Sequence, residues 1–414
     1  MRSLLLIILI SGFSQIYSQQ VFVVNSGSET LSKIDLENDT VENTFSSLGS
    51  LPNKMALTNE FAYVLNSGDN NIQKIDLQNG ATLNQIFLGS SVNPYDIIIH
   101  AGFAYVTGAF SNRVYKIDLI TESVLDNVLV GNNPAGMVIQ SGFLYVGNTD
   151  YMSNYQDCSI SVIDLEDFSL VDDIETEPNP INLLNYNGKI HISCCGNWVD
   201  EGGKISILNP EIQMIEFTFE MGGYTGNLTE LNGTVYVSDL MNSGIYAYNG
   251  ITYDIIHDHN NPFLPGGTAV CSGSQMLVVL GGEWGQNFTV WCYDELENLL
   301  ADYMVGLYGT DVKIREDESS LEDKFIPKSL LHSRNYPNPF NPVTEIFYEI
   351  LHSCEVELKI YNIRGQKIVT LVDSFQDAGN YQITWKADRC SAGIYFYKLE
   401  AGNDFLIKKM ELLK

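Results

Sequence analysis

Aromatic and acidic side chains gather in three glycine-containing stretches of the sequence. These stretches are GNTDYMSNYQDCS at 147–159, CCGNWVDEGGK at 194–204 and GGEWGQNF at 281–288. Aromatic rings beside carboxylates suit stacking on sugar rings, binding of cationic groups or contact with a protein partner. The candidate ligand-binding residues are Tyr151, Tyr155, Trp198, Asp200, Glu201, Glu283 and Trp284. The alternative is a set of long surface loops whose aromatic rings pack on one another.

Paired carboxylates in the same stretches suit one metal. Asp150 with Asp157, or Asp200 with Glu201, would offer the hard oxygen ligands that calcium prefers. No EF-hand or RTX spacing accompanies these pairs. The sequence therefore predicts no cofactor, and calcium is the one metal that its residues suggest.

Signatures of catalysis are missing from the sequence. It has no Walker A, GxSxG or HExxH motif, and no GxGxxG lies between a strand and a helix. His257 and His259 form the one close histidine pair. A histidine pair of this spacing on a strand can bind metal, but a surface turn at Asp258 explains it better. The pattern favours a binding protein over an enzyme.

An internal repeat supplies the elements that would position these stretches. The string AYVLN at 62–66 recurs as AYVTG at 104–108 and LYVGN at 144–148, and weaker copies begin at 21, 190, 235 and 276. Each copy is followed by a turn and three more strand-like segments. Four short strands per unit, seven times over, predict a seven-bladed β-propeller. GTDVKI at 309–314 would supply the first strand that the first unit lacks, and thus close the ring.

Aspartates recur where the repeated IDL strands end, at Asp35, Asp76, Asp118 and Asp164. They could be mistaken for a ring of functional carboxylates. An aspartate at the start of a turn accepts hydrogen bonds from nearby backbone amides. We therefore expect a structural role for all four.

The YV-N and ID pattern of residues 21–315 resembles the YVTN family of seven-bladed propellers. The first four copies match well, and later copies carry ILN, AYN and CYD in place of VID. The resemblance implies the fold and says little about function, because propellers host many unrelated activities.

A different pattern starts with NYPNPFNPVTEIFYEI at 335–350. Proline donates no backbone hydrogen bond and restricts the residue before it to extended conformations, so the Asn-Pro steps predict a stiff, extended lead segment. Short alternating strands and Gly-containing turns follow. They predict a small immunoglobulin-like β-sandwich.

Residues 334–414 resemble the C-terminal sorting domain of type IX secretion cargo, a FlgD-like immunoglobulin domain. The Asn-Pro segment, LKIYNIRGQKIVTLV, SAGIYFYKLEAG and KKMELLK carry the resemblance, with Cys390 where small or polar residues are usual. It implies an address that an outer-membrane translocon reads after the cargo has crossed the periplasm. The motif residues are Asn335, Pro337, Asn338, Pro339, Phe340, Asn341, Pro342, Gly365, Gln366, Gly393 and Tyr395.

The N-terminal stretch has the layout of a signal peptide. Arg2 precedes an apolar run that is too short to span a bilayer, and Ser18 is a suitable last residue before cleavage. The alternative is an N-terminal anchor or a buried strand. The predicted organisation is a signal peptide at 1–18, a propeller at 19–315, a linker at 316–333 and the sorting domain at 334–414.

The net charge of −29 is concentrated in the predicted propeller. Residues 21–315 carry 9 Lys and Arg against 36 Asp and Glu, whereas residues 334–414 carry 10 of each. Such a surface repels nucleic acid and anionic lipid. The seven cysteines are too irregular for a disulfide framework, although Cys354 and Cys390 could pair; buried thiols are the default expectation.

The sequence therefore predicts an all-β protein, a seven-bladed β-propeller followed by a small immunoglobulin-like β-sandwich, that is secreted or displayed at the bacterial cell surface. The expected function is non-enzymatic binding of a glycan or protein, with the type IX translocon as the export partner. We expect no nucleic-acid partner and no transmembrane span. The alternatives are an extracellular carbohydrate-active enzyme, a lyase or a hydrolase, and a purely structural surface protein.

Overall fold

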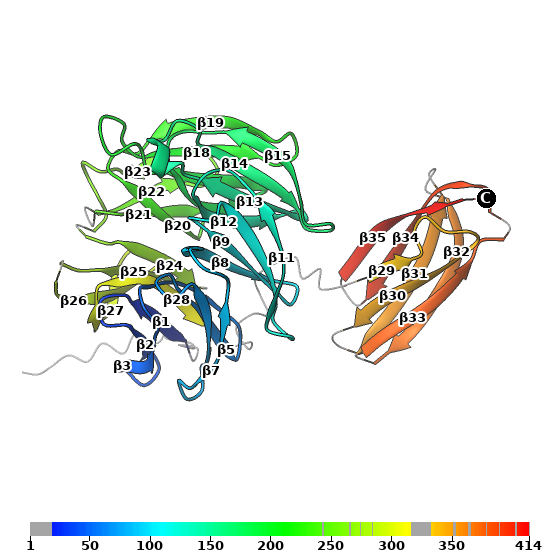
Figure 1. Ribbon diagram of the computed structural model, residues 1–414, viewed down its shortest axis with the longest axis horizontal. Coiled ribbons are helices and arrows are strands. Elements are labelled where there is room, and N and C mark those ends of the chain that lie inside the picture. The colour runs from blue at the N-terminus through cyan, green and yellow to red at the C-terminus, as the bar shows by residue number, and fades with distance from the viewer. Residues whose placement is uncertain are drawn as a thin grey trace, which may run out of the picture. The chain divides into compact units, whose positions relative to one another are not determined.

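The structure is a computed structural model. It describes residues 19–241, 244–264, 266–273, 275–283, 285–315, 333–350, 353–362, 366–377, 379–388, 390–401 and 404–413. The predicted signal peptide, nearly all of the predicted linker, Trp284 and Gly365 lie outside these residues. The chain divides into two compact units, Met1–Glu322 and Asp323–Lys414 (Figure 1).

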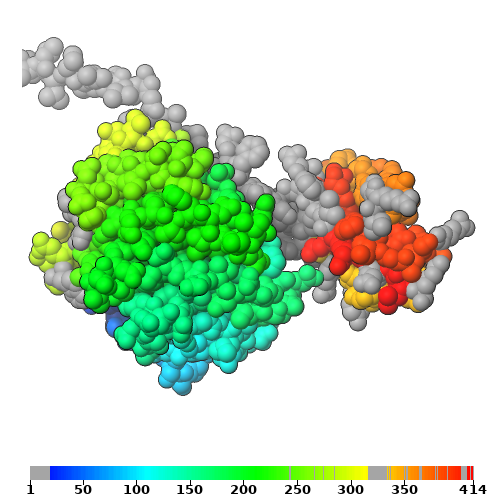
Figure 2. All heavy atoms as spheres, turned by 90° about the horizontal axis from the view of Figure 1, so that it is seen from above, coloured from blue at the N-terminus to red at the C-terminus, as the bar shows by residue number. Residues whose placement is uncertain are grey.

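The first unit is a β-propeller, and its described residues form seven four-stranded antiparallel sheets. The sheets, called blades one to seven here, are β28-β1-β2-β3, β4 to β7, β8 to β11, β12 to β15, β16 to β19, β20 to β23 and β24 to β27. Consecutive inner strands contact one another around the ring. Side chains fill the spaces between the sheets, so this unit has a continuous surface (Figure 2).

The four strand positions recur in every blade. The inner strands are β28 (Gly309–Arg315), β4 (Pro52–Leu57), β8 (Pro94–His100), β12 (Pro134–Gln140), β16 (Pro180–Tyr186), β20 (Thr225–Leu231) and β24 (Ala269–Gly273). The second strands are β1 (Gln20–Asn25), β5 (Phe61–Asn66), β9 (Phe103–Gly108), β13 (Phe143–Asn148), β17 (Lys189–Cys194), β21 (Thr234–Asp239) and β25 (Met276–Gly281). The third strands are β2 (Thr30–Asp35), β6 (Asn71–Asp76), β10 (Arg113–Asp118), β14 (Ser159–Asp164), β18 (Lys204–Asn209), β22 (Ile245–Asn249) and β26 (Asn287–Asp294). The outer strands are β3 (Thr40–Ser47), β7 (Thr82–Phe87), β11 (Ser123–Leu129), β15 (Ser169–Glu175), β19 (Met214–Glu220), β23 (Ile255–His257) and β27 (Leu299–Leu307).

The repeated YV-N strands are the second strands, and they are the most buried elements. In β5, β9 and β13 every residue after the first is buried. Both faces of these strands pack against neighbouring blades, which explains why they lack the polar alternation of a half-exposed strand. Outer strands such as β11 are mostly exposed.

The ring closes as the sequence predicts. Strand β1 pairs antiparallel with β28, with Val21 opposite Ile314 and Val23 opposite Val312. Blade one thus combines the last strand of the propeller with its first three, and the edge of each is covered.

Side chains at the third position of the inner strands tie some blades together. In three blades this side chain accepts a hydrogen bond from a backbone N–H of the next inner strand. The pairs are Asp311 with Met55 at 3.0 Å, Asp96 with Met137 at 2.9 Å and Asn182 with Leu228 at 2.9 Å. Each bond satisfies a backbone donor that would otherwise be costly to bury.

The four recurring aspartates have the structural role that was expected. Each accepts a backbone N–H two residues further on: Asp35 from Glu37, Asp76 from Gln78, Asp118 from Ile120 and Asp164 from Glu166, at 2.7 to 3.1 Å. Hydrogen bonds from Asn38, first from its side chain and then from its backbone, lower the pKa of Asp35.

The second unit has two antiparallel sheets. One is β29-β30-β33 and the other is β32-β31-β34-β35. The strands are β29 (Ser333–Tyr336), β30 (Val343–Ile350), β31 (Cys354–Asn362), β32 (Lys367–Gln376), β33 (Gly379–Lys386), β34 (Gly393–Ala401) and β35 (Asp404–Leu412). Val356, Leu358 and Ile360 point into the core, as the alternation of EVELKI predicts.

The Asn-Pro segment belongs to the sandwich itself, which differs from the lead segment expected from its prolines. Phe340 is 1% exposed and its ring lies 5.3 Å from that of Trp385. The Phe340 carbonyl accepts a hydrogen bond from Leu413 N–H at 2.8 Å. The prolines predicted an extended backbone for this segment. The burial of the Phe340 side chain packs the segment against the sandwich.

All seven cysteines lie in the described residues and have free thiols, so Cys354 and Cys390 do not pair. In the described part of the chain, no helix has the length and apolarity to cross a bilayer.

Candidate functional site

Two hollows open where the inner strands of the propeller begin and the second strands end. We call them the aromatic hollow and the channel hollow. Tyr95 and Ile181, the second residues of their inner strands, line both. The two spaces are therefore adjacent, with Tyr95 and Ile181 between them.

The aromatic hollow encloses about 220 Å³ at blades three, four and five. Four aromatic rings line it: Tyr95 from β8, Tyr151 and Tyr155 from the loop after β13, and Trp198 from the loop after β17. The remaining lining residues are Ala109, Asn133, Pro134, Ala135, Thr149, Asn179 and Ile181. Three of the candidate residues, Tyr151, Tyr155 and Trp198, are thus brought together.

The loop that carries Tyr151 and Tyr155 is organised by Asp150, which is fully buried. One Asp150 oxygen accepts the backbone N–H groups of Gln156 and Asp157 at 2.9 and 3.0 Å, and the other accepts the Asn132 side-chain amide at 3.0 Å. Burial acts to raise the pKa of Asp150, but these hydrogen bonds outweigh it and lower the pKa. A short 3₁₀ turn, η1 (Tyr151–Ser153), follows from this anchor.

Trp198 is held by a second anchored loop. The Asn197 side-chain oxygen accepts the backbone N–H groups of Val199, Asp200 and Glu201 at 3.0 to 3.1 Å. The indole ring stacks on Tyr224 with centroids 4.5 Å apart and planes 14° apart. Trp198 has φ of 62° and Tyr155 has φ of 60°, in the left-handed region that bulky residues rarely adopt. Both rings are therefore placed by backbone conformations that the surrounding loop bonds enforce.

The tyrosines of the aromatic hollow are neutral hydroxyl donors at neutral pH. Burial raises the pKa of Tyr95, and the nearby Asp96 carboxylate raises it further. Burial also raises the pKa of Tyr151. For Tyr155, burial raises the pKa and outweighs a hydrogen bond from Trp198 that lowers it.

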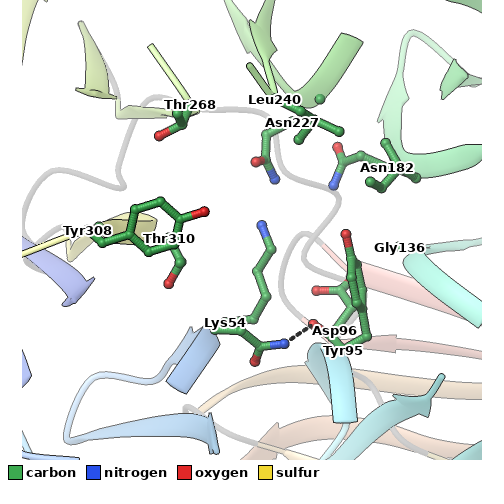
Figure 3. Close-up of a pocket in the computed structure, with 14 residues that line it drawn as sticks. Lys54, Tyr95, Asp96, Gly136, Asn182, Asn227, Leu240, Thr268, Tyr308 and Thr310 are labelled. Atoms are coloured by element: carbon green, nitrogen blue, oxygen red, sulfur yellow. Dashed lines mark hydrogen bonds between the residues drawn. The ribbon is translucent and has the colours of Figure 1, made fainter. Parts of the chain in front are cut away.

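The channel hollow encloses about 250 Å³ at the mouth of the central channel. Figure 3 shows the Lys54 amine pointing into its middle, with the Asn182 and Asn227 amides on one side and Tyr308 on another. Its lining residues are Asn53, Lys54, Tyr95, Asp96, Gly136, Ile181, Asn182, Gly226, Asn227, Leu240, Thr268, Tyr308, Gly309 and Thr310.

Two lysines and two aspartates lie at or near the channel hollow, Lys54, Lys313, Asp96 and Asp311. The Lys54 amine lies 3.3 Å from an Asp311 oxygen, and the two side chains are 14% and 3% exposed. Asp96 is half-buried, and its side chain lines the channel hollow. Burial raises the pKa of Asp96, opposed by the charges of Lys54 and Lys313. The Asp311 carboxylate in turn raises the pKa of Lys313.

The acidic candidates do not join either hollow. Asp200 accepts a hydrogen bond from Asn197 at 2.9 Å, Glu201 lies 3.7 Å from Lys204, and Glu283 accepts one from Gln286 at 2.9 Å. Trp284 lies outside the described residues. The loop after β25 in blade seven, which carries Glu283, therefore contributes no described residue to the aromatic hollow.

The structure gives the calcium hypothesis no support. Both oxygens of Asp150 already accept N–H hydrogen bonds. Within the described residues, no group of three or more His, Cys, Asp or Glu side chains is arranged to hold a metal ion. His257 and His259 likewise belong to no such group.

Residues 334–412 match the family model for the secretion system C-terminal sorting domain. The match confirms the C-terminal sorting domain of type IX secretion, and it indicates that the protein is secreted or exported to the cell surface. Within this domain, Phe340 and Tyr395 are buried in the core, whereas Pro337, Asn338, Pro339 and Asn341 are exposed. Gly393 begins β34 with φ of 144°, and the Gln366 N–H is bonded to the Asn362 side chain.

Solved structures resemble the chain in fold. A protein of unknown function from Desulfotomaculum acetoxidans aligns with a TM-score of 0.56 at 14% identity, over 72% of this chain and 99% of that one. Hydrazine synthase from Kuenenia stuttgartiensis aligns at 0.52 and 14% identity, over 64% and 96%. Virginiamycin B lyase from Staphylococcus aureus aligns at 0.50 and 13% identity, over 69% and 91%. At these identities the likeness shows the fold alone. No curated protein matches the chain.

Proposed function

We propose that this exported protein is a non-enzymatic, YVTN-type propeller that binds a glycan in the aromatic hollow, carried ahead of its sorting domain. The observation that carries the proposal is the convergence of four aromatic rings from three blades on one space. We further propose that residues 1–18 are a signal peptide, and that 316–333 link a propeller at 19–315 to the sorting domain.

The chemistry of the aromatic hollow suits a sugar ring. The C–H face of a sugar packs well on the face of an aromatic ring, and tyrosine hydroxyls at the edge can bind sugar hydroxyls. The Asn133 and Asn179 amides in the wall are already engaged with the carbonyls of Ala109 and Gly196 at 2.9 and 3.3 Å. Recognition in this hollow therefore rests on the rings.

A panel of tetrasaccharides, neutral and uronate-bearing, titrated calorimetrically into the purified full-length protein tests the proposal. Trp198→Ala and Tyr151→Ala should each weaken the binding of any tetrasaccharide that the unaltered protein binds, by about 30-fold for Trp198→Ala. Phe87→Ala is the matched control, because Phe87 is a 61% exposed aromatic residue on the outer strand β7.

Two results would overturn the proposal. One is that no tetrasaccharide binds. The other is that Trp198→Ala and Tyr151→Ala bind it as tightly as the unaltered protein does, which would place the ligand elsewhere on the molecule.

A further inference from the structure

We propose that the channel hollow binds the carboxylate of the same ligand, so that the ligand class is a glycan carrying a single uronic acid. This inference rests on the proposed function and names the ligand more closely. The aromatic hollow would take a sugar ring, and the adjoining space beyond Tyr95 and Ile181 would take its acidic neighbour.

Three nitrogen donors, on Lys54, Asn182 and Asn227, face the channel hollow. The Lys54 amine points into the open space, and the amide nitrogens of Asn182 and Asn227 face the same region from the opposite wall (Figure 3). A carboxylate has two acceptor oxygens and no donor, so it fits a space where an ammonium and two amides converge.

Three side chains at this hollow already accept backbone N–H groups through one of their oxygens. Asp311 accepts the Met55 N–H at 3.0 Å and is 2% exposed. One oxygen of Asp96 accepts the Met137 N–H at 2.9 Å. The Asn182 oxygen accepts the Leu228 N–H at 2.9 Å, which turns its amide nitrogen towards the hollow. The backbone thus engages one oxygen of each of these three side chains, and the amide nitrogen of Asn182 faces the hollow together with that of Asn227.

The strongly acidic surface limits how many charges the ligand carries. The chain has a net charge of −29, and such a field repels polyanions approaching from solution. Salt screens interactions beyond about 8 Å at physiological ionic strength, so one carboxylate in the hollow interacts mainly with nearby groups: the Lys54 ammonium, which also pairs with Asp311, and the Asn182 and Asn227 amides. A glycan with a single acidic residue avoids the repulsion that a polyanion would meet, and it still offers one carboxylate to the hollow.

The size of the hollows supports one ligand that occupies both. They enclose about 220 and 250 Å³, each below the roughly 300–1,000 Å³ that is usual for a complete small-molecule site. Since both are lined by Tyr95 and Ile181, adjacent sugar residues of one chain can enter the two spaces.

The test compares tetrasaccharides that bear one terminal glucuronate, galacturonate or mannuronate with the methyl ester of each, using the full-length protein. The ester keeps the sugar and removes the charge. We expect the acid that binds best to bind about 10- to 100-fold more tightly than its ester. Lys54→Met should remove that preference and leave the affinity for the ester within about twofold.

Asn227→Asp is a second variant, because Lys54→Met could disturb folding by removing the partner of Asp311. It replaces a donor by a negative charge, and we expect it to weaken binding of the acid and spare the ester. Lys189→Met is the matched control, since Lys189 pairs with Glu216 at 2.7 Å on the outside of blade five.

Each outcome separates the two proposals. Equal affinity for acid and ester, or a preference that survives both variants, would overturn the carboxylate site and leave the glycan-binding proposal standing. If no acid, ester or neutral sugar binds, both the carboxylate site and the glycan-binding proposal are overturned.

Discussion

The two hollows share a wall but are built in different ways. The aromatic hollow owes three of its four rings to loops after second strands, and those loops are held by their own Asp150 and Asn197 anchors. The channel hollow is lined largely by inner strands, whose polar side chains also tie blade to blade. Ring side chains on the loops, such as Trp198, can therefore be changed with little loss of stability, whereas channel side chains also stabilise the fold.

The largest expected effect is on the channel side. Asp311→Ala would remove the acceptor of the Met55 N–H and the partner of Lys54. Breaking a buried ion pair from one side costs about 3 kcal/mol or more. Urea denaturation should show that loss. A loss below about 1 kcal/mol would mean that a substitution in the inner strands costs no more stability than a substitution in the loops.

The second effect tests a polar group inside the scaffold of blade five. His191 is fully buried, its Nδ1 lies 2.8 Å from the Tyr248 hydroxyl, and burial lowers its pKa to about 4. The unfolded chain takes up a proton near pH 6.5 and the folded protein does not until about pH 4. Stability is therefore full above about pH 6.5 and falls by about 3 kcal/mol as the pH drops to 4.

Denaturation at pH 7 and pH 4.5 measures this effect. His191→Gln keeps a hydrogen-bonding side chain without the titration, so it should lose less stability between the two pH values than the unaltered protein. An equal loss in both would assign the acid sensitivity to other groups.

The third effect is on the loop side. Trp198→Ala should weaken glycan binding about 30-fold, corresponding to about 2 kcal/mol. It should lower the free energy of unfolding by about 1 kcal/mol or less, because Trp198 is 40% exposed. Calorimetry and urea denaturation on the same preparation check both halves. A stability loss as large as that of Asp311→Ala would show that the loop residues of the aromatic hollow stabilise the fold as much as the strand residues of the channel hollow do.

The smallest effect is that of Asp96→Asn. The asparagine oxygen can still accept the Met137 N–H, as Asn182 does for Leu228 in blade five. The change removes a carboxylate whose pKa is raised by burial, so stability at pH 7 should stay within about 1 kcal/mol of the original. As the pH falls below the raised pKa, the folded protein protonates Asp96, and the free energies of unfolding of the two proteins should approach each other. A larger loss at pH 7 would show that the charge itself holds Lys54 in place.

The sequence predicted the architecture, and three of its candidate residues lie together in the aromatic hollow. The repeat spacing, the closing strand at 309–314 and the structural aspartates follow from local pattern and turn chemistry. Tyr151, Tyr155 and Trp198 were predicted because long loops at equivalent positions of a ring must meet at one face. The sequence could not show that Asp200 and Glu201 turn away, since that depends on the bonds of Asn197.

The channel side of the site was missed because its residues lie in strands that look like ordinary core. Tyr95 and Lys54 stand in PYDIII and PNKMAL, among apolar neighbours. Alignment of the seven inner strands would have shown a polar side chain at the third position of most of them. Which of these side chains point into open space is a matter of packing and could not be obtained from the pattern.

A crystal structure of the full-length protein with a bound tetrasaccharide would show whether the glycan occupies the two hollows. We expect one sugar ring to lie on the rings of Tyr151, Tyr155 or Trp198, with its neighbour extending past Tyr95 towards Lys54. A sugar bound to the outer strands or to the sorting domain, with both hollows unoccupied, would contradict the account.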